Sequence, residues 1–357
     1  MTASHSRSLV SVIIPIYHNE ENIQVTWAAV EQTLEVLPEG IDWEVIFIDD
    51  GSKDASYERL VELREREPGR VRVIRFTRNF GQTAAILAGL QRAYGDCCIV
   101  MSADLQDPPE LMLDMVQRWN AGEKKVVLAH RESREDSYFA RLTSRTFYWL
   151  MRRYAIPNMP DGGFDFFLID RHIVDIINEM DERNSFLQGQ VLWTGFTPEL
   201  IPYTRRRREI GTSRWTLSKK LKYFVDGFVS YTETPIRMIT LLGLVVSTLS
   251  FAYASLIFVM RLFWQIPVEG WAPIMIALLM LGGIQLVMLG VIGEYVWRNI
   301  HEARKRPAFV IESVLEGADD AEEAVVGDGA PRSLPTPSHG ALTSGARPMR
   351  RSETQPR

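Results

Sequence analysis

The stretch Met101–Glu110, with the sequence MSADLQDPPE, decides the fold that we expect for this chain. It follows an apolar run, Cys97–Val100, that is typical of a buried strand, and its two prolines open a helical pattern. Asp104 therefore comes just after the carboxyl end of a predicted strand. Ligands bind at that edge of an open α/β sheet. A strand-end turn with a helix cap would also explain the stretch, so its function depends on what other segments bring to the same edge.

The first 130 residues alternate between continuous apolar runs and helical patterns. Strands are expected at 9–16, 43–48, 71–76, 97–100 and 126–129, and helices at 20–37, 55–67, 82–94 and 109–120. This alternation predicts an α/β fold with a parallel sheet covered on both faces. Tyr17 and Asp50 follow the first two strands, as Asp104 follows the fourth. Because G-x-G-x-x-G and G-x-x-x-x-G-K-[ST] loops are missing from the sequence, a dinucleotide or P-loop site is not expected.

Oxygen-bearing side chains at this edge suit a divalent metal that bridges a diphosphate. Asp104 and Gln106 offer the ligands that Mg²⁺ and Mn²⁺ prefer. Residues 205–222 add eight basic residues against one acidic residue, although the whole chain has a net charge of −5. Arginine binds two phosphate oxygens at once, so this run could hold phosphates. Attraction to anionic lipid is the alternative, and one run can do both. We expect Arg205–Arg207 in particular to face lipid headgroups.

Two uncharged segments near the C-terminus are long enough to cross a bilayer. Met238–Met260 and Trp271–Gly293 each exceed the roughly 20 residues needed for a ~30 Å hydrocarbon core. Two buried core helices are the alternative. Basic residues flank both outer ends, whereas the link Leu262–Gly270 contains no lysine or arginine, so the positive-inside rule places both termini in the cytoplasm. An apolar stripe within 216–230 predicts a helix lying in the membrane interface.

The motifs of the chain, taken in order and followed by two membrane segments, resemble the family-2 glycosyltransferases of the polyisoprenyl-phosphate type. That group includes dolichyl-phosphate mannosyltransferase, bactoprenol glucosyltransferase and undecaprenyl-phosphate aminoarabinose transferase. The resemblance extends from about Val10 to Arg306. The motifs that carry it are Pro15–Tyr17, Asp49–Ser52, Arg78–Gly81, Ala103–Glu110, and Arg208 with Gly211–Arg214.

The resemblance implies a GT-A type nucleotide-binding domain with Mg²⁺ or Mn²⁺ at Asp104 and Gln106. It implies that Asp50 contacts the nucleotide base and that Asp165 orients the sugar or phosphate. The residues that it places in the donor site are Pro15, Tyr17, Asn19, Asp50, Ser102, Ala103, Asp104, Gln106, Arg131, Arg208, Ser213 and Arg214. The catalytic residues that it implies are Asp104, Asp165, Arg208 and Arg214.

The expected reaction is inverting transfer of a sugar from a nucleotide-sugar donor to a polyisoprenyl (undecaprenyl) phosphate. The product would be a lipid-linked monosaccharide for cell-envelope glycan modification. By resemblance UDP-glucose is the favoured donor, and a GDP-sugar is second. A lipid monophosphate is already anionic near pH 7, so it needs no strong general base. The expected partners are the donor, the lipid acceptor and membrane lipids, with no nucleic acid and with self-association left open.

One departure from the family pattern bears on function. Relatives usually have Asp where this chain has Ser102, so one expected carboxylate is missing. This leaves two alternatives in view. A processive polysaccharide synthase of the same fold would carry Q-x-x-R-W, but here Gly211 stands in place of that Gln, and two membrane spans are few for a polymer channel. A non-catalytic membrane scaffold is the other, for which Ser102 is the main support.

We therefore expect an integral protein of the bacterial inner membrane whose catalytic domain and both termini are cytoplasmic. The expected layout is a GT-A domain at 1–214, an interfacial helix at 215–234, and two membrane helices within 235–300, at about 238–260 and 271–293. A juxtamembrane segment at 301–315 and a disordered tail at 316–357 would follow.

Overall fold

The computed structural model describes residues 7–122, 124–131, 146, 148–180, 186–206, 231–232, 234–263, 270–304 and 306–316. The interfacial helix expected at 216–230, the basic residues Arg207, Arg208 and Arg214, and the expected tail beyond Glu316 lie outside these ranges.

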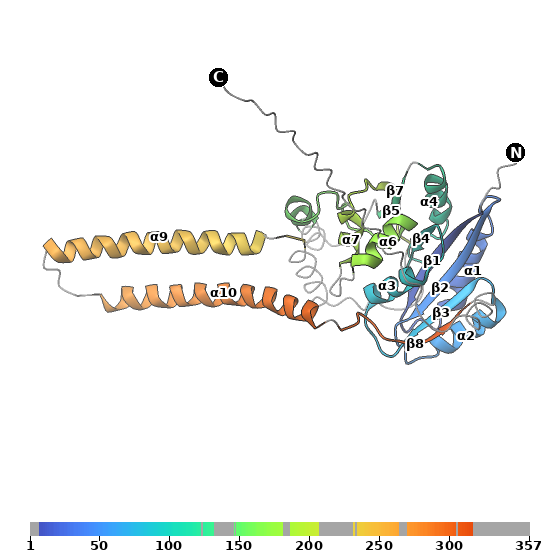
Figure 1. Ribbon diagram of the computed structural model, residues 1–357, viewed down its shortest axis with the longest axis horizontal. Helices are drawn as coiled ribbons and strands as arrows, with labels where there is room; N and C mark the ends of the chain where they lie inside the picture. The colour runs from blue at the N-terminus through green and yellow to red at the C-terminus, as the bar shows by residue number, and fades with distance from the viewer. Residues whose placement is uncertain are drawn as a thin grey trace, which may run out of the picture. The chain divides into compact units, whose positions relative to one another are not determined.

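An eight-stranded sheet forms the centre of the α/β domain, with the order β7-β5-β6-β4-β1-β2-β3-β8 (Figure 1). Strands β4, β1, β2 and β3 run parallel, and β5 is parallel to β7. Strand β6 is antiparallel to both β4 and β5, and β8 is antiparallel to β3. The strands are β1 (Ser8–Ile16), β2 (Ile41–Asp49), β3 (Val71–Phe76), β4 (Cys97–Val100), β5 (Val126–Arg131), β6 (Phe167–Asp170), β7 (Glu199–Tyr203) and β8 (Ile311–Leu315).

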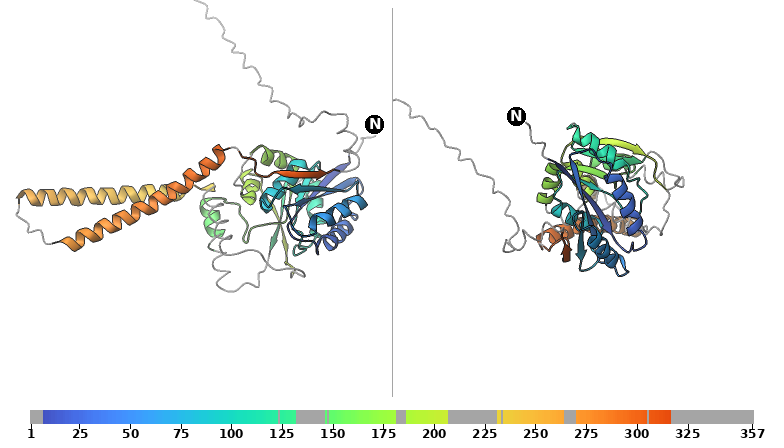
Figure 2. Two further views of the ribbon diagram at one scale, coloured as in Figure 1. Left: turned by 90° about the horizontal axis from the view of Figure 1, so that it is seen from below. Right: turned by 90° about the vertical axis from the view of Figure 1, so that its right-hand side faces the viewer.

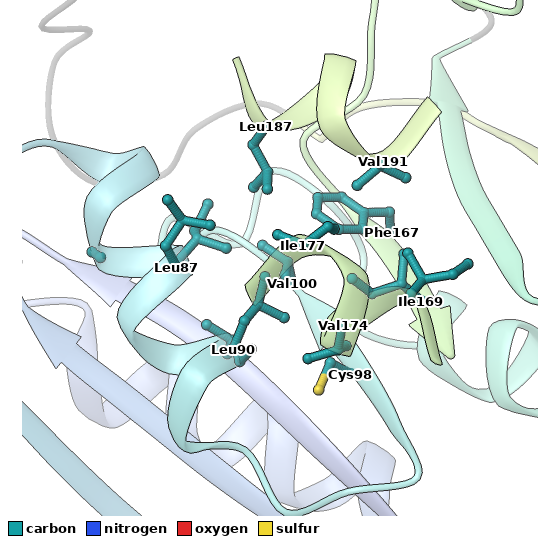
Figure 3. Close-up of a cluster of buried hydrophobic side chains, with 14 of the residues drawn as sticks. Leu87, Leu90, Cys98, Val100, Phe167, Ile169, Val174, Ile177, Leu187 and Val191 are labelled. Carbon is teal, nitrogen blue, oxygen red and sulfur yellow. The ribbon is translucent and has the colours of Figure 1, made fainter. Parts of the chain in front are cut away.

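Helices cover both faces of the sheet. Apolar side chains of α1, α2 and α4 form one buried cluster, and those of α3, α6 and α7 form the other. Figure 2 accordingly shows α1 and α6 on opposite sides of the sheet. Figure 3 shows the second cluster, in which Leu87 and Leu90 lie near Val174 and Ile177. The helices are α1 (Ile23–Leu34), α2 (Ser56–Arg66), α3 (Gln82–Arg92), α4 (Leu111–Asn120), α6 (Arg171–Met180) and α7 (Leu187–Trp193).

The two cysteines show how the strands divide the core. Cys98 belongs to the cluster of Figure 3 and Cys97 to the cluster on the other face, and both thiols are free and buried. Neighbouring residues of a strand point to opposite faces, which accounts for this division. The prediction that the pair packs the core and forms no bridge is confirmed.

The predicted alternation of strands and helices is confirmed, with a mostly parallel sheet. Each expected strand is present, and those at 71–76 and 97–100 have the expected bounds. The sequence did not lead us to expect β6, β7 or β8. Strand β6 has only four residues, and Pro202 lies inside β7, where proline argues against a strand. Strand β8 lies within the segment expected to be juxtamembrane.

The parallel strands end along one side of the sheet, which we call the carboxyl edge. Tyr203, the last residue of β7, pairs with Arg131, the last residue of β5, so both lie at this edge. Because β8 is antiparallel, its first residue is the one at the carboxyl edge: Ile311 pairs with Phe76, the last residue of β3. Strands β7 and β8 are the two outermost strands of the sheet. Along the chain, β7 precedes and β8 follows two long helices that are described next.

Two long apolar helices, α9 (Thr234–Phe263) and α10 (Trp271–Ala303), follow β7 in the chain. Their segments Ile236–Tyr253 and Met280–Trp297 are long and apolar enough to cross a membrane, and neither segment is buried inside the protein. Large side chains such as Phe251, which is 77% exposed, lie on their surface. Apolar surface of this extent is typical of helices that contact lipid and not of core helices.

Candidate active site

Asp50 follows β2 and fixes the loop that follows β3. Its Oδ1 accepts the Phe80 N–H at 2.6 Å, and its Oδ2 accepts the Gly81 N–H at 2.9 Å. The residue is 3% exposed, and burial raises the pKa of its carboxyl group to about 6 despite these two hydrogen bonds. The geometry therefore shows a loop anchor. Contact between Asp50 and a nucleotide base stays a prediction.

Gly51 permits the close approach of these two loops. Its φ is +66°, and a Cβ at this position would lie 2.4 Å from the carbonyl carbon of Arg78. Only glycine accommodates both the left-handed backbone and the contact. The motif Asp49–Ser52 is thus explained locally by the packing of the loop after β2 against the loop after β3.

The loop after β1 carries the expected donor-site residues Tyr17 and Asn19. The backbone N–H of His18 donates to Ser52 Oγ at 2.9 Å, and that of Asn19 donates to Ser56 Oγ at 2.9 Å. These bonds hold the loop beside the one that contains Asp50. Tyr17 is 39% exposed at the end of β1, and Pro15 is partly buried within the strand. The structure thus brings the expected nucleotide-side residues together.

The loop after β4 forms a tight turn around the Asp104 carboxylate. Ser102 Oγ donates to Asp104 Oδ1 at 2.8 Å, and the Gln106 backbone N–H approaches the same oxygen at 3.3 Å. Leu105 between them has a positive φ of 51°, which is uncommon for a residue other than glycine. The Ala103 carbonyl accepts a 2.9 Å hydrogen bond from Thr26 Oγ1 of α1. The turn is therefore held from both sides while Asp104 and Gln106 stay partly exposed.

The donor atoms of this turn fit a divalent cation. A carboxylate and a side-chain amide oxygen are hard ligands of the kind that Mg²⁺ and Mn²⁺ prefer. Within the described part of the chain, no group of three or more His, Cys, Asp or Glu residues could hold a metal ion. A metal at Asp104 and Gln106 would therefore need further ligands, which a diphosphate and water can supply.

A buried polar chain leads from this turn to Arg131. Ser102 Oγ lies 3.4 Å from Asp107 Oδ2, and the Tyr203 hydroxyl donates to Asp107 Oδ1. Arg131 Nε in turn donates to the Tyr203 hydroxyl at 3.0 Å. Burial raises the pKa of Asp107 above its usual range, while the Tyr203 hydrogen bond and nearby arginines oppose that shift. Burial, and next the Asp107 charge, raise the pKa of Tyr203.

Asp165 lies at the far end of this chain. One Arg131 terminal nitrogen donates to Asp165 Oδ2 at 2.8 Å, and Gln188 Nε2 lies 3.2 Å from Asp165 Oδ1. Gln188 Nε2 also donates to the Phe164 carbonyl. Asp165 precedes β6, whose antiparallel direction brings its amino end to the carboxyl edge. The Asp165 side chain is 48% exposed, so it remains open to a ligand.

Two arginines that follow β7 contact the loop after β4. The Arg206 backbone N–H donates to the Gln106 carbonyl at 2.8 Å, and its side chain pairs with Glu110 at 3.2 Å. Arg205 Nε lies 3.6 Å from Asp107 Oδ1. The Arg206 side chain is still 54% exposed, and contact of Arg205 and Arg206 with lipid headgroups stays a prediction.

The expected site residues are thus only partly placed. Ser102, Asp104, Arg131 and Asp165 are linked into one polar chain, whereas Arg208, Ser213 and Arg214 lie outside the described residues. Three linking residues were missed, namely Asp107, Gln188 and Tyr203. Asp107 stands inside the opening motif and could have been considered, but its partner Tyr203 carries no local sequence signal.

Comparison with known proteins gives consistent matches. The model of the family described as Glycosyl transferase family 2 matches residues 11–192. A protein of Bacillus subtilis (strain 168) that is named uncharacterized glycosyltransferase YkcC is 34% identical over 302 residues, which are 85% of this chain and 93% of that protein. Bactoprenol glucosyl transferase of Shigella phage SfV is 34% identical over 304 residues, covering 85% of this chain and 98% of the relative.

A solved structure, a mannosyltransferase from Pyrobaculum calidifontis in complex with GDP-Man and Mn²⁺, matches more distantly. It has a TM-score of 0.45 and 15% identity, over 63% of this chain and 64% of that one.

The packing at Gly51 predicts a matched pair of alanine variants. Gly51→Ala should destabilise the protein by about 3 kcal/mol or more, because it adds left-handed strain of about 1 to 2 kcal/mol and separates the loop anchored by Asp50. Gly40→Ala should cost only the strain, since Gly40 has a φ of +94° but nothing within 4 Å of its Cβ position. Unfolding in detergent would measure both. Equal losses would show that the contact with Arg78 does not matter.

Proposed function

The chain belongs to glycosyl transferase family 2, and we propose that it transfers one sugar from a nucleotide-sugar donor to a polyisoprenyl phosphate in a membrane, with inversion at the anomeric carbon. It is a glycosyltransferase, and its relatives include proteins named bactoprenol glucosyl transferase. Those names support a lipid acceptor, and they favour UDP-glucose over a GDP-sugar as the donor.

The observation that carries the proposal is where the chain leaves and rejoins the sheet. Strand β7 ends at the carboxyl edge before the chain continues to α9, and β8 begins at the same edge after α10. Just before β8, the Val310 carbonyl accepts a 3.1 Å hydrogen bond from the N–H of Thr77, the residue after β3. Between Ala303, the end of α10, and Val310 the chain can span at most about 25 Å. The ligand-binding edge is therefore tied closely to the end of an apolar helix.

This tie suits an acceptor whose phosphate lies at the surface of a bilayer. If α9 and α10 cross the membrane, the headgroup region lies at their ends, within reach of the carboxyl edge. A soluble acceptor would need no such connection. We place the catalytic domain on the cytoplasmic face, where nucleotide sugars are available and where the flanking basic residues predict both termini.

The chemistry that this site must perform is mainly electrostatic. An anionic phosphate attacks the anomeric carbon, and a nucleoside diphosphate leaves, so negative charge has to be balanced on both sides. Arg131 offers a buried guanidinium that is 7% exposed and faces Asp165. We assign Arg208, Ser213 and Arg214 to the phosphates as well. Because Arg131 and Gln188 both engage Asp165, we assign this carboxylate to orienting the sugar or the phosphate.

We assign Asp104 and Gln106 to a bound Mg²⁺ or Mn²⁺, which would supply positive charge to the leaving diphosphate. Ser102 cannot replace a carboxylate ligand in charge. Its hydroxyl instead holds Asp104 Oδ1 at 2.8 Å, which keeps the turn in place for the cation. The missing carboxylate is thus compatible with an active enzyme.

Sugar transfer by the purified protein tests the proposal. With labelled UDP-glucose, Mn²⁺ and undecaprenyl phosphate, we expect a lipid carrying a single sugar and no product in EDTA. Asp104→Ala should slow transfer at least about a hundredfold, because it removes the metal's carboxylate. Asp114→Ala, at an exposed position of α4, serves as the control and should be unchanged. A polymer would indicate a synthase, and full activity in EDTA would rule out the metal site. No product from any UDP- or GDP-sugar would indicate a scaffold.

Cysteine labelling tests the membrane topology. The native Cys97 and Cys98 are both 0% exposed, so an impermeant maleimide should ignore them. Val268→Cys, between α9 and α10, should react from outside intact spheroplasts. Ala121→Cys, at an exposed position of the α/β domain, should react only after permeabilisation. The reverse pattern would contradict a cytoplasmic catalytic domain.

A further inference from the structure

Tyr203 lies between two charged groups that the mechanism needs in fixed positions. Its hydroxyl donates to Asp107 Oδ1 and accepts from Arg131 Nε at 3.0 Å. A phenol has one proton to donate and lone pairs that accept, so one hydroxyl satisfies both partners at once. A phenylalanine of the same shape would satisfy neither.

Burial makes this arrangement hard to replace with water. Asp107 is 1% exposed, Tyr203 is 7% exposed and the Arg131 side chain is 7% exposed. A buried donor or acceptor that loses its partner bears the full cost of its desolvation, and the cost is larger for charged groups. The hydroxyl of Tyr203 therefore contributes more than an exposed hydrogen bond would.

The sheet itself sets the position of Tyr203. Arg131 and Tyr203 are register partners at the ends of the parallel strands β5 and β7. From there the Tyr203 side chain reaches Asp107, which lies 96 residues earlier in the chain. Asp107 Oδ2 in turn lies 3.4 Å from the hydroxyl of Ser102, which holds Asp104. The end of β7 is thereby connected to the turn around Asp104, which we call the metal-side turn because we assign the metal to it. It is also connected to Arg131, which we assign to the phosphates.

We propose that Tyr203 is a positioning residue for sugar transfer, which holds the Arg131 guanidinium toward Asp165 and keeps Asp107 beneath the metal-side turn. The proposal rests on the proposed function. Tyr203 keeps two opposite charges apart by standing between them. Without the hydroxyl, Asp107 would lose its hydrogen bond from Tyr203, and Arg131 would be drawn toward that carboxylate and away from Asp165, while the charges of the site would stay the same.

Removal of the hydroxyl alone tests this role, and Tyr57 provides a matched control. Tyr203→Phe should lower kcat about ten- to a hundredfold, because two buried charged groups lose a hydrogen bond. Tyr57→Phe removes a hydroxyl that contacts Ser313 Oγ at 3.0 Å, away from the proposed catalytic residues, and kcat should change less than about twofold. Rates are compared for equal amounts of monodisperse, folded protein.

A double variant separates positioning from general destabilisation. Arg131→Lys keeps the charge but lacks Nε, so it should already lose the contribution of the hydroxyl. Adding Tyr203→Phe to Arg131→Lys should then lower kcat less than about threefold further. Additive losses would show that Tyr203 acts independently of Arg131 and would overturn the proposal. If Tyr203→Phe does not fold, Arg131→Lys alone is the test, and wild-type kcat in that variant would overturn it.

The outcomes also distinguish this inference from the proposed function. If the wild type and Tyr57→Phe transfer no sugar with any donor, the proposed function fails and the inference falls with it. If both transfer sugar and Tyr203→Phe transfers it equally well, the enzyme assignment stands and the positioning role of Tyr203 is wrong.

Discussion

Asp107 is a carboxylate that is 1% exposed, and a charge so deeply buried must be matched by partners. Tyr203 donates to it, and Arg205 and Ser102 lie near its two oxygens at 3.6 and 3.4 Å. These partners come from the end of β7 and from the loop after β4. Satisfying one buried charge therefore brings the loop after β4 and the end of β7 together, and the rest of the candidate site is built around that contact.

The serine at position 102 has a physical explanation in this setting. A carboxylate there would stand beside Asp104 and Asp107, and like charges at close range oppose one another. The hydroxyl of Ser102 adds no charge and donates to Asp104 at 2.8 Å. The chain thus keeps an ordered turn with one carboxylate fewer. The cost is one anionic ligand fewer for a bound metal, whose place the diphosphate of the donor would have to take.

Local sequence patterns predicted the parts of the fold that depend on neighbouring residues, such as continuous apolar strands and the turns that follow them. The apolar strands at 71–76 and 97–100 could be read with their bounds, and the motif around Asp104 indicated the edge that carries the site. Strand β7 was missed because it contains Pro202, and β8 because it follows the predicted membrane segments. The contact of Tyr203 with Asp107 depends on the register of β5 and β7, which no local pattern encodes. The position of Asp165 at the carboxyl edge depends on the antiparallel direction of β6, which no local pattern encodes either.

The two outermost strands also connect the carboxyl edge to the apolar helices, so the sheet that carries the candidate site is joined to these helices through both of its outer strands. The central claim is that a nucleoside diphosphate and a metal ion bind together at the Asp104 turn on this edge. Anomalous diffraction from crystals of the protein grown with UDP and Mn²⁺ tests it most directly. The account predicts a manganese peak coordinated by Asp104, Gln106 and the diphosphate. Bound UDP with manganese elsewhere, or with Asp104 and Gln106 away from it, would contradict the account.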